Sequence, residues 1–537
     1  MRLLLLTAFL LGSLTAARAP LPELVPKGDA VQLHVDGEPF LILGGELGNS
    51  TASDLSYLAP HWESFRALGM NTVLAPVSWE MIEPEEGEFD FAAVDGLIEA
   101  AREAEIRLVL LWFGTWKNSM STYVPAWVKR DQARFVRARQ ADGAPLDILS
   151  PHVEASWEAD ARAFRALMAH LARTDRDRTV LMVQVENEVG MIPEARDRSA
   201  AAEADWQASV PDALTAKLRE GAAGEALTAL WEKTGRASSG SWREVFGESA
   251  EAEEVFTAWH LASYVEHVAA AGLQAYDLPL YVNAALQRPG AAPGGYPAGG
   301  PLPHLFAVWQ AAAPSIDMLS PDIYFEDFVS RVSAYDVPGN AVFVPEANRT
   351  DRAEAAADAF FAVGALGAIG FSPFSIENVT DEPNESLAEA YRVLGSLAPM
   401  ILEHQGDGSM VGLKAPVAYD GTVAEAPQAF ALGGYDFTAT MVDPWMPKDT
   451  QDIAAHGGLV ISLGEGEFLA AGRGVTLTFV PSEGGHGGIE VAREGEVIDG
   501  EWRPGRWMNG DQTHQGRHVR LPPDSFSVQR FTLYSYE

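Results

Sequence analysis

The sequence predicts an α/β fold, a (β/α)8 TIM barrel followed by an all-β C-terminal domain. Over the first 400 residues, short apolar runs rich in β-branched residues alternate with amphipathic segments, a pattern typical of buried parallel strands joined by helices. Eight such runs occur, the number that closes this kind of barrel. A doubly wound open sheet is the alternative, but no G-x-G-x-x-G follows an early strand, so a dinucleotide site is not supported.

The eight expected strands are short, apolar and bounded by turns or helical segments. They lie near Phe40–Gly45, Thr72–Pro76, Arg107–Trp112, Thr179–Val185, Leu278–Asn283, Ile316–Ser320, Ala341–Pro345 and Ala368–Phe374. The expected helices repeat apolar residues at helical spacing. They lie near His61–Leu68, Val94–Ala104, Trp157–Ala172, Val255–Ala270, Ala353–Leu366 and Ser386–Leu397. In such a barrel, side chains that follow the strands meet at one mouth.

Two insertions and a change of pattern complete the expected organisation. A charged, helical stretch from Met191 to about Ala250 follows the fourth strand, and the Gly/Pro-rich segment Pro289–Pro303 after the fifth strand predicts a loop at the barrel mouth, with a domain linker as the alternative. After about Glu403, β-forming segments alternate with Gly, Pro and Asp turns, for example Gly474–Val480 and Ser525–Ser535. The barrel is therefore expected over 20–402 and the β-rich domain over 403–537.

The N-terminus has the three parts of a secretory signal peptide. Met1-Arg2 is positively charged, Leu3 to Leu14 is apolar, and Thr15-Ala16-Ala17 resembles a cleavage site. The apolar run is shorter than the ~20 residues of a membrane span, although an N-terminal anchor or a buried helix is the alternative. Residues 1–19 are therefore predicted to be a signal peptide. Export of a chain without cysteine predicts a periplasmic or secreted bacterial protein.

Composition excludes several functional classes. The 537 residues include 38 Lys+Arg and 75 Asp+Glu, a formal charge of −37, which disfavours nucleic acids and anionic membranes as partners. The absence of cysteine excludes disulfides, thiolate nucleophiles and cysteine-ligated metals. No H-E-x-x-H is present among the 12 histidines, so we expect neither a catalytic metal nor another cofactor.

Two glutamates follow expected strands at matching positions. Glu188 comes after the fourth strand in Gln184-Val185-Glu186-Asn187-Glu188, and Glu346 comes after the seventh in Phe343-Val344-Pro345-Glu346. Carboxyl groups at these places can face each other across the mouth of a barrel. Hydrolysis of a glycosidic bond with retention needs two carboxyl groups about 5–5.5 Å apart. A glutamate at a strand end can also be a solvated cap, but the repeated placement favours catalysis.

Three strings of residues resemble a known family. The segment from Trp79 to Phe91 (WEMIEPEEGEFDF) resembles a signature of clan A glycoside hydrolases. Together with Gly69-Met70-Asn71-Thr72-Val73 and the string Gln184–Gly190, it is similar to glycoside hydrolase family 35, the β-galactosidases, and most to bacterial members with a β-rich C-terminal extension. The resemblance covers about residues 30–400 and, more weakly, the tail.

The resemblance implies roles for individual residues. Glu188 matches the acid/base, Glu346 the nucleophile, and Asn187 the partner of the sugar 2-hydroxyl. The chain departs from the family at Leu74-Ala75-Pro76, where a tyrosine is usual, and at Trp112–Asn118, which replaces an Arg-Pro-Gly-Pro-Tyr run. Further substrate-binding candidates, each with a structural role as its alternative, are Asn118, Trp116, Glu46 and Tyr324, the last of which is expected to hydrogen-bond the nucleophile.

The resemblance implies a retaining, exo-acting β-galactosidase that hydrolyses terminal β-D-galactosides of plant-derived oligo- or polysaccharides through a glycosyl-enzyme. Other clan A activities (β-glucosidase, β-mannosidase or endo-glycanase) and a non-catalytic carbohydrate-binding protein are the alternatives. The expected partner is a carbohydrate with terminal β-galactose. The oligomeric state stays open, with a homodimer as one option.

Overall fold

The structure is a computed structural model that describes residues 19–348, 352–378, 383–498 and 500–537. The predicted signal peptide therefore lies outside the described residues except for Ala19. Among the described helices, none combines the length and the apolar character that a bilayer crossing requires.

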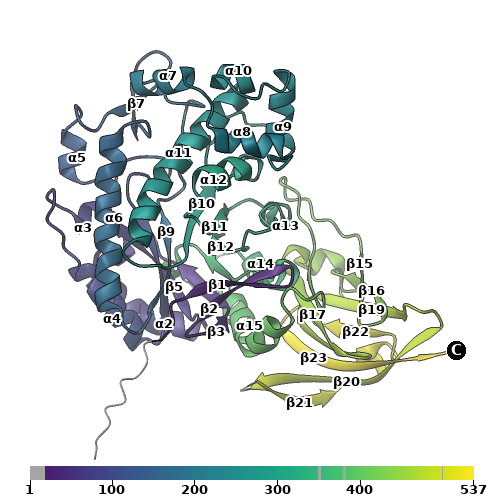
Figure 1. Cartoon of the computed structure of the whole chain (residues 1–537). Coiled ribbons are helices and arrows are strands. Elements are labelled where there is room, and N and C mark those ends of the chain that lie inside the picture. Colours follow the sequence, from purple (N-terminus) through teal and green to yellow (C-terminus); the bar gives the residue numbers. More distant parts are fainter. Residues whose placement is uncertain (1–18, 349–351, 379–382, 499) are drawn as a thin grey trace, which may run out of the picture.

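A closed barrel of eight parallel strands forms the first part of the chain (Figure 1). In chain order the strands are β4 (Ile42–Glu46), β5 (Thr72–Ser78), β6 (Arg107–Phe113), β9 (Val180–Val185), β10 (Leu280–Ala285), β11 (Met318–Ile323), β12 (Val344–Ala347) and β13 (Gly370–Pro373). Each predicted strand corresponds to one of these, and β13 pairs with β4 to close the barrel. The predicted fold class is confirmed.

The barrel helices bury one face each, as their sequence spacing requires. In α4 (Ala92–Glu103) the buried residues Val94, Leu97, Ile98 and Ala101 follow the i, i+3, i+4, i+7 spacing of a helix face. The other helices of this part are α1 (Leu55–Leu58), α2 (Trp62–Ala67), α3 (Trp79–Ile82), α5 (Ala126–Arg130), α6 (Glu154–Thr174), α11 (Ala250–Leu273), α12 (Phe306–Ala312), α13 (Phe328–Ser333), α14 (Glu354–Leu366) and α15 (Pro383–His404).

Two small sheets were not predicted. An antiparallel sheet of β1 (Glu23–Lys27), β2 (Ala30–Val35) and β3 (Glu38–Phe40) precedes the barrel. Leu33 and Val35 of β2 join the core cluster that fills the barrel interior. The second sheet pairs β7 (Arg137–Arg139) with β8 (Pro145–Leu149). Four of these strands have only three to five residues, and the six-residue β2 has the polar Gln32 and His34 between its apolar residues, so none is a continuous apolar run.

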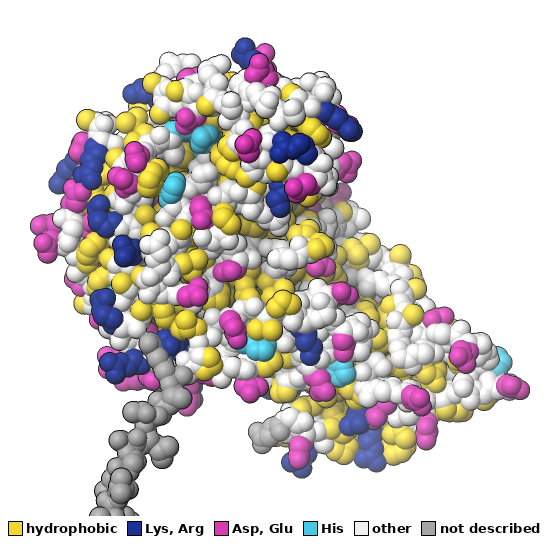
Figure 2. Space-filling model, viewed as in Figure 1, with side chains coloured by type: hydrophobic (Ala, Val, Ile, Leu, Met, Phe, Trp, Pro, Cys, Tyr) yellow, Lys and Arg dark blue, Asp and Glu magenta, His cyan; other side chains and the backbone are white. Residues whose placement is uncertain are grey.

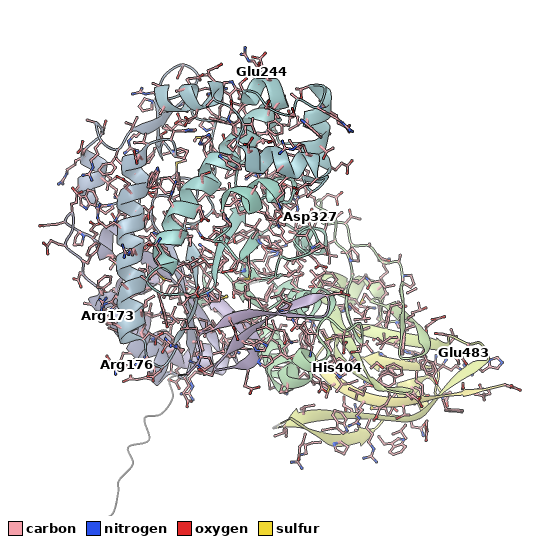
Figure 3. All side chains as sticks on the ribbon, viewed as in Figure 1. Arg173, Arg176, Glu244, Asp327, His404 and Glu483 are labelled. Carbon is pink, nitrogen blue, oxygen red and sulfur yellow. The ribbon has the colours of Figure 1, made fainter. Side chains whose placement is uncertain are left out.

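Both predicted insertions lie on the same side of the barrel. The stretch after β9 forms α7 (Ala200–Gln207), α8 (Asp212–Arg219), α9 (Gly224–Lys233) and α10 (Trp242–Phe246), which lie at the top of Figure 1. Figure 3 places Glu244 of α10 at the outer edge of this cap. The Gly/Pro segment after β10 is a loop, and its Ala298 exchanges backbone hydrogen bonds of 2.9 and 3.0 Å with Met191.

The C-terminal region is all-β, as predicted, and its two antiparallel sheets form a β-sandwich. The six-stranded sheet contains β14 (Met410–Lys414), β17 (Gly457–Gly464), β18 (Glu467–Arg473), β23 (Ser527–Tyr536), β20 (His486–Ile498) and β21 (Glu501–Trp507). The four-stranded sheet contains β15 (Gln428–Leu432), β16 (Tyr435–Thr440), β19 (Val475–Pro481) and β22 (His518–Leu521). Apolar side chains from both sheets, such as Phe437 and Phe531, form one core between them. Figure 3 shows Glu483 at the far end of this domain, away from the barrel.

Helix α14 packs directly on the six-stranded sheet and joins the barrel to the sandwich. The Phe360 and Phe526 rings stack with their centroids 5.2 Å apart. Gly364 and Gly412 allow the helix and β14 to approach, since a Cβ atom at Gly412 would lie 2.3 Å from the Ala365 nitrogen. The boundary expected at residue 403 falls near the end of α15, and it stays a prediction. On the visible face, acidic side chains are scattered over both parts (Figure 2).

Candidate active site

Glu188 lies in a strained turn directly after β9. Glu186 has a φ of +64° and Glu188 a φ of +46°, left-handed conformations that are unusual for residues other than glycine. Such conformations persist only when the surrounding contacts hold them, and they concentrate at functional sites. Glu186 and Asn187 are buried, and the Glu188 residue is only 8% exposed.

The loop after β6 supplies those contacts. Asn118 and Ser119 also have positive φ values, of +51° and +59°. The Asn118 side-chain amide donates a hydrogen bond to the Glu188 carboxylate, and the Ser119 hydroxyl donates to the Glu188 carbonyl at 2.7 Å. Lys117 donates to the Asn187 side-chain oxygen at 2.9 Å. The two loops thereby fix the direction in which Glu188 points.

Glu346 lies on β12, on the opposite part of the same mouth. The Tyr324 hydroxyl donates a hydrogen bond to Glu346 Oε1, so the contact expected from the sequence is present. Glu346 Oε2 is buried without a hydrogen-bond partner among the described residues. One oxygen of Glu346 is therefore held in place, whereas the other has an open acceptor.

The two predicted catalytic glutamates lie close together. Carboxylate oxygens of Glu188, Asp322 and Glu346 are all within 4.8 Å of one another. This separation suits direct attack by one carboxylate while the other transfers a proton, and it leaves no room for a water molecule between an inverting pair.

Asp322 and Asn283 belong to this group and were missed in the sequence. Asp322 is the penultimate residue of β11 and lies beside Glu346 in the strand register, and Asn283 lies on β10. The Asn283 amide donates to Asp322 Oδ2 at 2.6 Å, and its oxygen accepts from the Glu188 backbone N–H at 2.9 Å. Both residues lie at or near the carboxyl end of an expected strand, so the rule that identified Glu188 and Glu346 also applies to them.

Burial raises the pKa of several of these carboxyl groups. Burial, followed by the negative charge of Glu346, raises the pKa of Glu188 to about 7, while Lys117 and the hydrogen bond from Asn118 oppose the rise. The pKa of Glu46 is well above its usual range, mainly because of burial and then because of Glu346. Burial and the same neighbour also raise the pKa of Asp322. A protonated Glu188 is the form that a general acid requires.

A second pair of carboxyl groups lies behind the Glu188 turn. Burial and the neighbouring Asp160 raise the pKa of Glu186 well above its usual range. Asp160 accepts from Trp112 Nε1 at 2.8 Å and from the Thr115 N–H at 3.0 Å, and Glu186 accepts from the Trp116 N–H at 2.7 Å. This pair connects β9, α6 and the loop after β6.

The remaining predicted binding residues lie around the same mouth in different environments. The Asn187 amide nitrogen and both Glu46 carboxyl oxygens are buried without partners, Asn118 is exposed, and Tyr324 is 37% exposed. The Trp116 ring is buried and packs at 4.5 Å against Tyr264, so any sugar contact from it involves its unpartnered ring N–H. The structure brings all seven predicted site residues to one end of the barrel.

Unpartnered polar atoms of the described residues concentrate at this place. More than half of the buried side-chain nitrogen and oxygen atoms without a hydrogen-bond partner belong to residues on or just after the barrel strands. They are on Glu46, Trp116, Gln184, Glu186, Asn187, Tyr281, Ser320, Asp322, Glu346 and Ser372. Since buried polar groups are normally paired, this concentration indicates a ligand rich in hydroxyl groups or ordered water.

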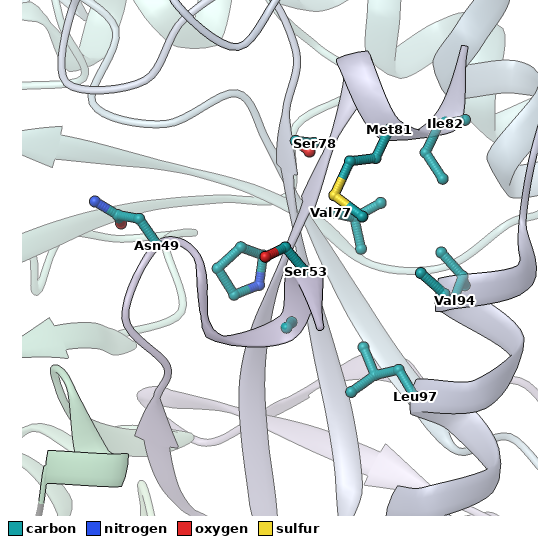
Figure 4. Close-up of a pocket in the computed structure, with 11 residues that line it drawn as sticks. Asn49, Ser53, Val77, Ser78, Met81, Ile82, Val94 and Leu97 are labelled. Carbon is teal, nitrogen blue, oxygen red and sulfur yellow. The ribbon is translucent and has the colours of Figure 1, made fainter. Parts of the chain in front are cut away.

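Other candidate sites are separate from the carboxyl cluster. His152, Asp205 and His260 form a second cluster, with side-chain atoms within 4.8 Å of one another. A small pocket of about 30 Å³ lies between β5 and α4 and is lined largely by apolar residues such as Met81, Val94 and Leu97 (Figure 4). It contains none of the predicted catalytic residues. The expected absence of a metal stays a prediction.

Two family models match parts of the chain. Residues 56–219 match the model of glycoside hydrolase family 42, described as beta-galactosidase. Residues 387–520 match a domain of unknown function, DUF5597. The first match contains Glu188 and the Asn118 loop, and the second covers much of the β-sandwich and part of α15.

Proteins with known names are similar to parts of the chain. The chain is 29% identical over 188 residues to a beta-galactosidase of Xanthomonas manihotis, which is 32% of this chain and 28% of that protein, so it spans under a third of the relative's length. Similar solved structures include the beta-galactosidase of Marinomonas ef1, at 12% identity with 67% of this chain and 60% of that chain covered and a TM-score of 0.47. Another is the beta-galactosidase of Bacillus circulans sp. alkalophilus, at 16% identity, 68% and 57% coverage and a TM-score of 0.47.

The family assignment from the sequence requires a correction. The sequence strings pointed to family 35, whereas the matching family model is that of family 42. The broader expectation, a likeness to clan A β-galactosidases, is supported by the same match. The strings around Trp79 and Glu188 describe the strand ends of a barrel of this clan and did not discriminate between its families.

Proposed function

We propose that the protein is a retaining β-galactosidase that removes terminal β-D-galactose from oligo- or polysaccharides. The observation that carries this proposal is the pair Glu188 and Glu346, whose carboxylate oxygens lie within 4.8 Å at the mouth of the barrel. The similarity of residues 56–219 to beta-galactosidases supports galactose as the sugar.

In the first step, Glu346 attacks the anomeric carbon and Glu188 gives its proton to the leaving oxygen. Tyr324 holds one oxygen of Glu346, which leaves the unpartnered Oε2 to form the bond to the sugar. The raised pKa of Glu188, about 7, keeps the acid largely protonated in mildly acidic solution and about half protonated at neutral pH. The products are a glycosyl-enzyme and the released alcohol.

In the second step, water hydrolyses the glycosyl-enzyme. Glu188, now ionised, removes a proton from the attacking water, and the ester bond to Glu346 breaks. Glu188 regains its proton in this way, and Glu346 returns to the carboxylate form. The hydrogen bonds from Asn118 to the carboxylate and from Ser119 to the backbone hold Glu188 in place for both transfers.

The sugar contacts follow from the unpartnered groups. Asn187 lies beside Glu188 with a free, buried amide nitrogen, which suits the 2-hydroxyl contact that the family resemblance implies. Glu46 and Trp116 offer further buried groups, and Asn118 and Tyr324 line the more exposed side. An exo-acting enzyme that binds one terminal residue fits this arrangement.

The predicted cellular context extends the proposal. The predicted signal peptide favours export to the bacterial periplasm or out of the cell, and we propose plant-derived galactosides as the substrates. The wider alternatives are another clan A hydrolase activity and a sugar-binding protein without catalysis. The unpartnered carboxyl groups favour catalysis, because a purely binding site would not need two adjacent buried acids. A homodimer remains one option for the assembly.

A panel of aryl glycosides tests the proposal. Purified protein should cleave the aryl β-galactoside faster than the matching glucoside, mannoside and xyloside, and a chelator should leave the rate unchanged. The Glu346→Ala variant is the control for contaminating activity. Faster cleavage of the glucoside or mannoside would reject galactose, and binding without cleavage of any substrate would support the non-catalytic alternative.

A further inference from the structure

Four carboxyl groups are enclosed at the mouth, and one buried cation faces them. The groups are Glu46, Glu188, Asp322 and Glu346, each no more than 8% exposed, and the cation is Lys117. Like charges at such distances cannot all ionise in a buried site. The proposed reaction needs Glu346 ionised and Glu188 protonated, and Lys117 is the buried cation that favours negative charge on Glu46, Glu188 and Asp322.

Asp322 lies between the two catalytic glutamates. It neighbours Glu346 in the strand register, and its carboxylate is within 4.8 Å of both glutamates. Asn283 donates to Asp322 Oδ2, whereas Oδ1 is buried with no donor among the described residues. An unpaired buried carboxylate oxygen is costly, but the same oxygen carrying a proton can donate to a neighbouring acceptor.

The charged and titratable groups around Asp322 come from several elements. They are Glu46 of β4, Lys117 after β6, Glu188 after β9, Tyr281 of β10, Tyr324 after β11, Tyr335 after α13 and Glu346 of β12. Three of these are carboxyl groups that disfavour a negative charge on Asp322, and Lys117 is the cation that favours one.

We infer that Asp322 keeps its proton throughout the reaction cycle and donates a hydrogen bond to the carboxylate that Glu188 becomes after it protonates the leaving oxygen. This inference rests on the proposed function. Asp322 is a positioning residue, because it acts through Glu188 and transfers no proton itself. The proton that Glu188 loses goes to the leaving oxygen, and the attacking water replaces it in the second step.

This hydrogen bond also sets the pH range of the acid. Burial alone disfavours an ionised Glu188, and a donor directed at the ionised form makes proton loss easier. Asp322 thus limits the rise in the pKa of Glu188 and helps to keep it near 7, so that the residue can serve as both acid and base. Without the donor, Glu188 would be a weaker acid and less readily ionised.

The test is the basic limb of the pH profile of kcat/KM, measured on the aryl glycoside that the protein cleaves best. Activity falls on this limb as the free enzyme loses the Glu188 proton. In Asp322→Asn, the amide still accepts from Asn283 and donates toward Glu188 without charge, so the limb should stay where it is in the wild type. In Asp322→Ala, the donor is lost and the limb should move up by about one pH unit.

An ionised Asp322 would predict a shift of the basic limb in the opposite direction. If Asp322 were ionised in the wild type, its negative charge would raise the pKa of Glu188, and both variants would move the basic limb to lower pH. That result would overturn the inference. Asp327→Asn is the matched control, since it neutralises a carboxylate of the same segment, labelled in Figure 3, that pairs with Arg331 at 2.9 Å. It should leave the limb unchanged.

Difference infrared spectroscopy gives a readout that does not need turnover. At neutral pH, the spectrum of the folded wild type minus that of folded Asp322→Asn should contain the carbonyl band of one protonated carboxylic acid. If this difference spectrum instead contained the band of an ionised carboxylate, the inference would be contradicted even if both variants were inactive. If the wild type cleaves no glycoside at all, the proposed function fails, whereas the infrared result still decides the charge of Asp322.

Discussion

Two regions bury charged groups in different ways. At the barrel mouth, four carboxyl groups face one lysine, and several of their oxygens have no partner. Where α14 meets the β-sandwich, Asp358 and Lys414 are almost fully buried and lie 3.0 Å apart. Nearby, Arg473 donates to the Ala455 carbonyl, the Ser386 hydroxyl and the Ala353 carbonyl at 2.8–3.0 Å.

The presence or absence of partners within the protein distinguishes charged groups that stabilise the fold from charged groups that are open to a ligand. At the domain junction each charge has an opposite charge or several acceptors, so its burial is compensated within the protein. At the mouth the carboxyl groups raise one another's pKa, and their open oxygens can be satisfied only by protons, water or substrate. The same residue type therefore has a structural role in one place and a chemical one in the other.

The largest expected effect is the loss of either catalytic glutamate. Glu346→Ala should lower kcat by several orders of magnitude for every substrate, because no glycosyl-enzyme can form. Glu188→Ala should be severe for a poor leaving group and mild for a dinitrophenyl galactoside, whose phenolate leaves without a proton. Steady-state rates on both substrates measure this difference.

Azide distinguishes the two roles by product stereochemistry. In Glu188→Ala, azide should replace water on the covalent intermediate and give the β-galactosyl azide. In Glu346→Ala, it should attack from the opposite face and give the α product, as proton NMR can show. An α-azide from Glu188→Ala would reverse the assignment.

At the domain junction, the expected effect is on stability and not on catalysis. Asp358→Asn leaves Lys414 buried without its counter-ion and should lower the free energy of unfolding by about 3–5 kcal/mol. The double variant Asp358→Leu/Lys414→Met is the control, because it removes both charges and should recover much of the loss. Chemical denaturation measures both, and kcat of the folded fraction should be unchanged. Equal losses in the single and double variants would mean that packing, and not charge, explains the effect.

The sequence predicted the barrel because each strand is an apolar run with a helix after it. The strands β1–β3 gave no such signal: β3 has three residues, and β1 is half-exposed and polar at both ends. Their place depends on contacts far along the chain, such as the hydrogen bond from the Asp29 N–H to the Gly406 carbonyl at 2.9 Å. A pattern within a short window cannot show contacts of that kind.

For the site, the sequence predicted the two glutamates and five residues around them, but it missed Asp322, Asn283, Lys117 and Asp160. Glu188, Glu346 and Tyr324 follow apolar strands, so position alone identified them. Asp160 lies within α6 and Lys117 lies in a loop, and neither position differs from that of an ordinary surface residue in the sequence. Their importance depends on burial, which places Asp160 behind Glu186 and Lys117 beside Asn187.

A smaller effect should follow from loss of the hydrogen bond to the nucleophile. Tyr324→Phe keeps the ring at the mouth but removes the donor to Glu346 Oε1. A hydrogen bond to a charged group contributes about 1.5–3 kcal/mol, so kcat/KM should fall about tenfold to a hundredfold. Tyr335→Phe is the control, because its hydroxyl donates to the Pro301 carbonyl and not to a catalytic group. A Tyr324→Phe enzyme with full activity would show that the contact does not contribute to catalysis.

The smallest expected effect concerns Glu186, two residues from Glu188 in the same turn. If Glu186 is protonated, as burial beside Asp160 requires, a glutamine is its neutral match: the amide donates to Asp160, and its oxygen accepts from the Trp116 N–H. Glu186→Gln should therefore change the free energy of unfolding by less than about 1 kcal/mol and leave kcat within a few-fold, since both contacts persist.

Glu188→Gln, measured beside it, should lose most activity on a poor leaving group because an amide cannot supply the proton. Glu186→Ala should be destabilised by about 1–3 kcal/mol, because the buried Trp116 N–H loses its acceptor. If Glu186→Gln were as damaging as Glu188→Gln, Glu186 would have to be ionised, and the separation between a partnered carboxyl group behind the turn and a reactive one in front of it would not hold.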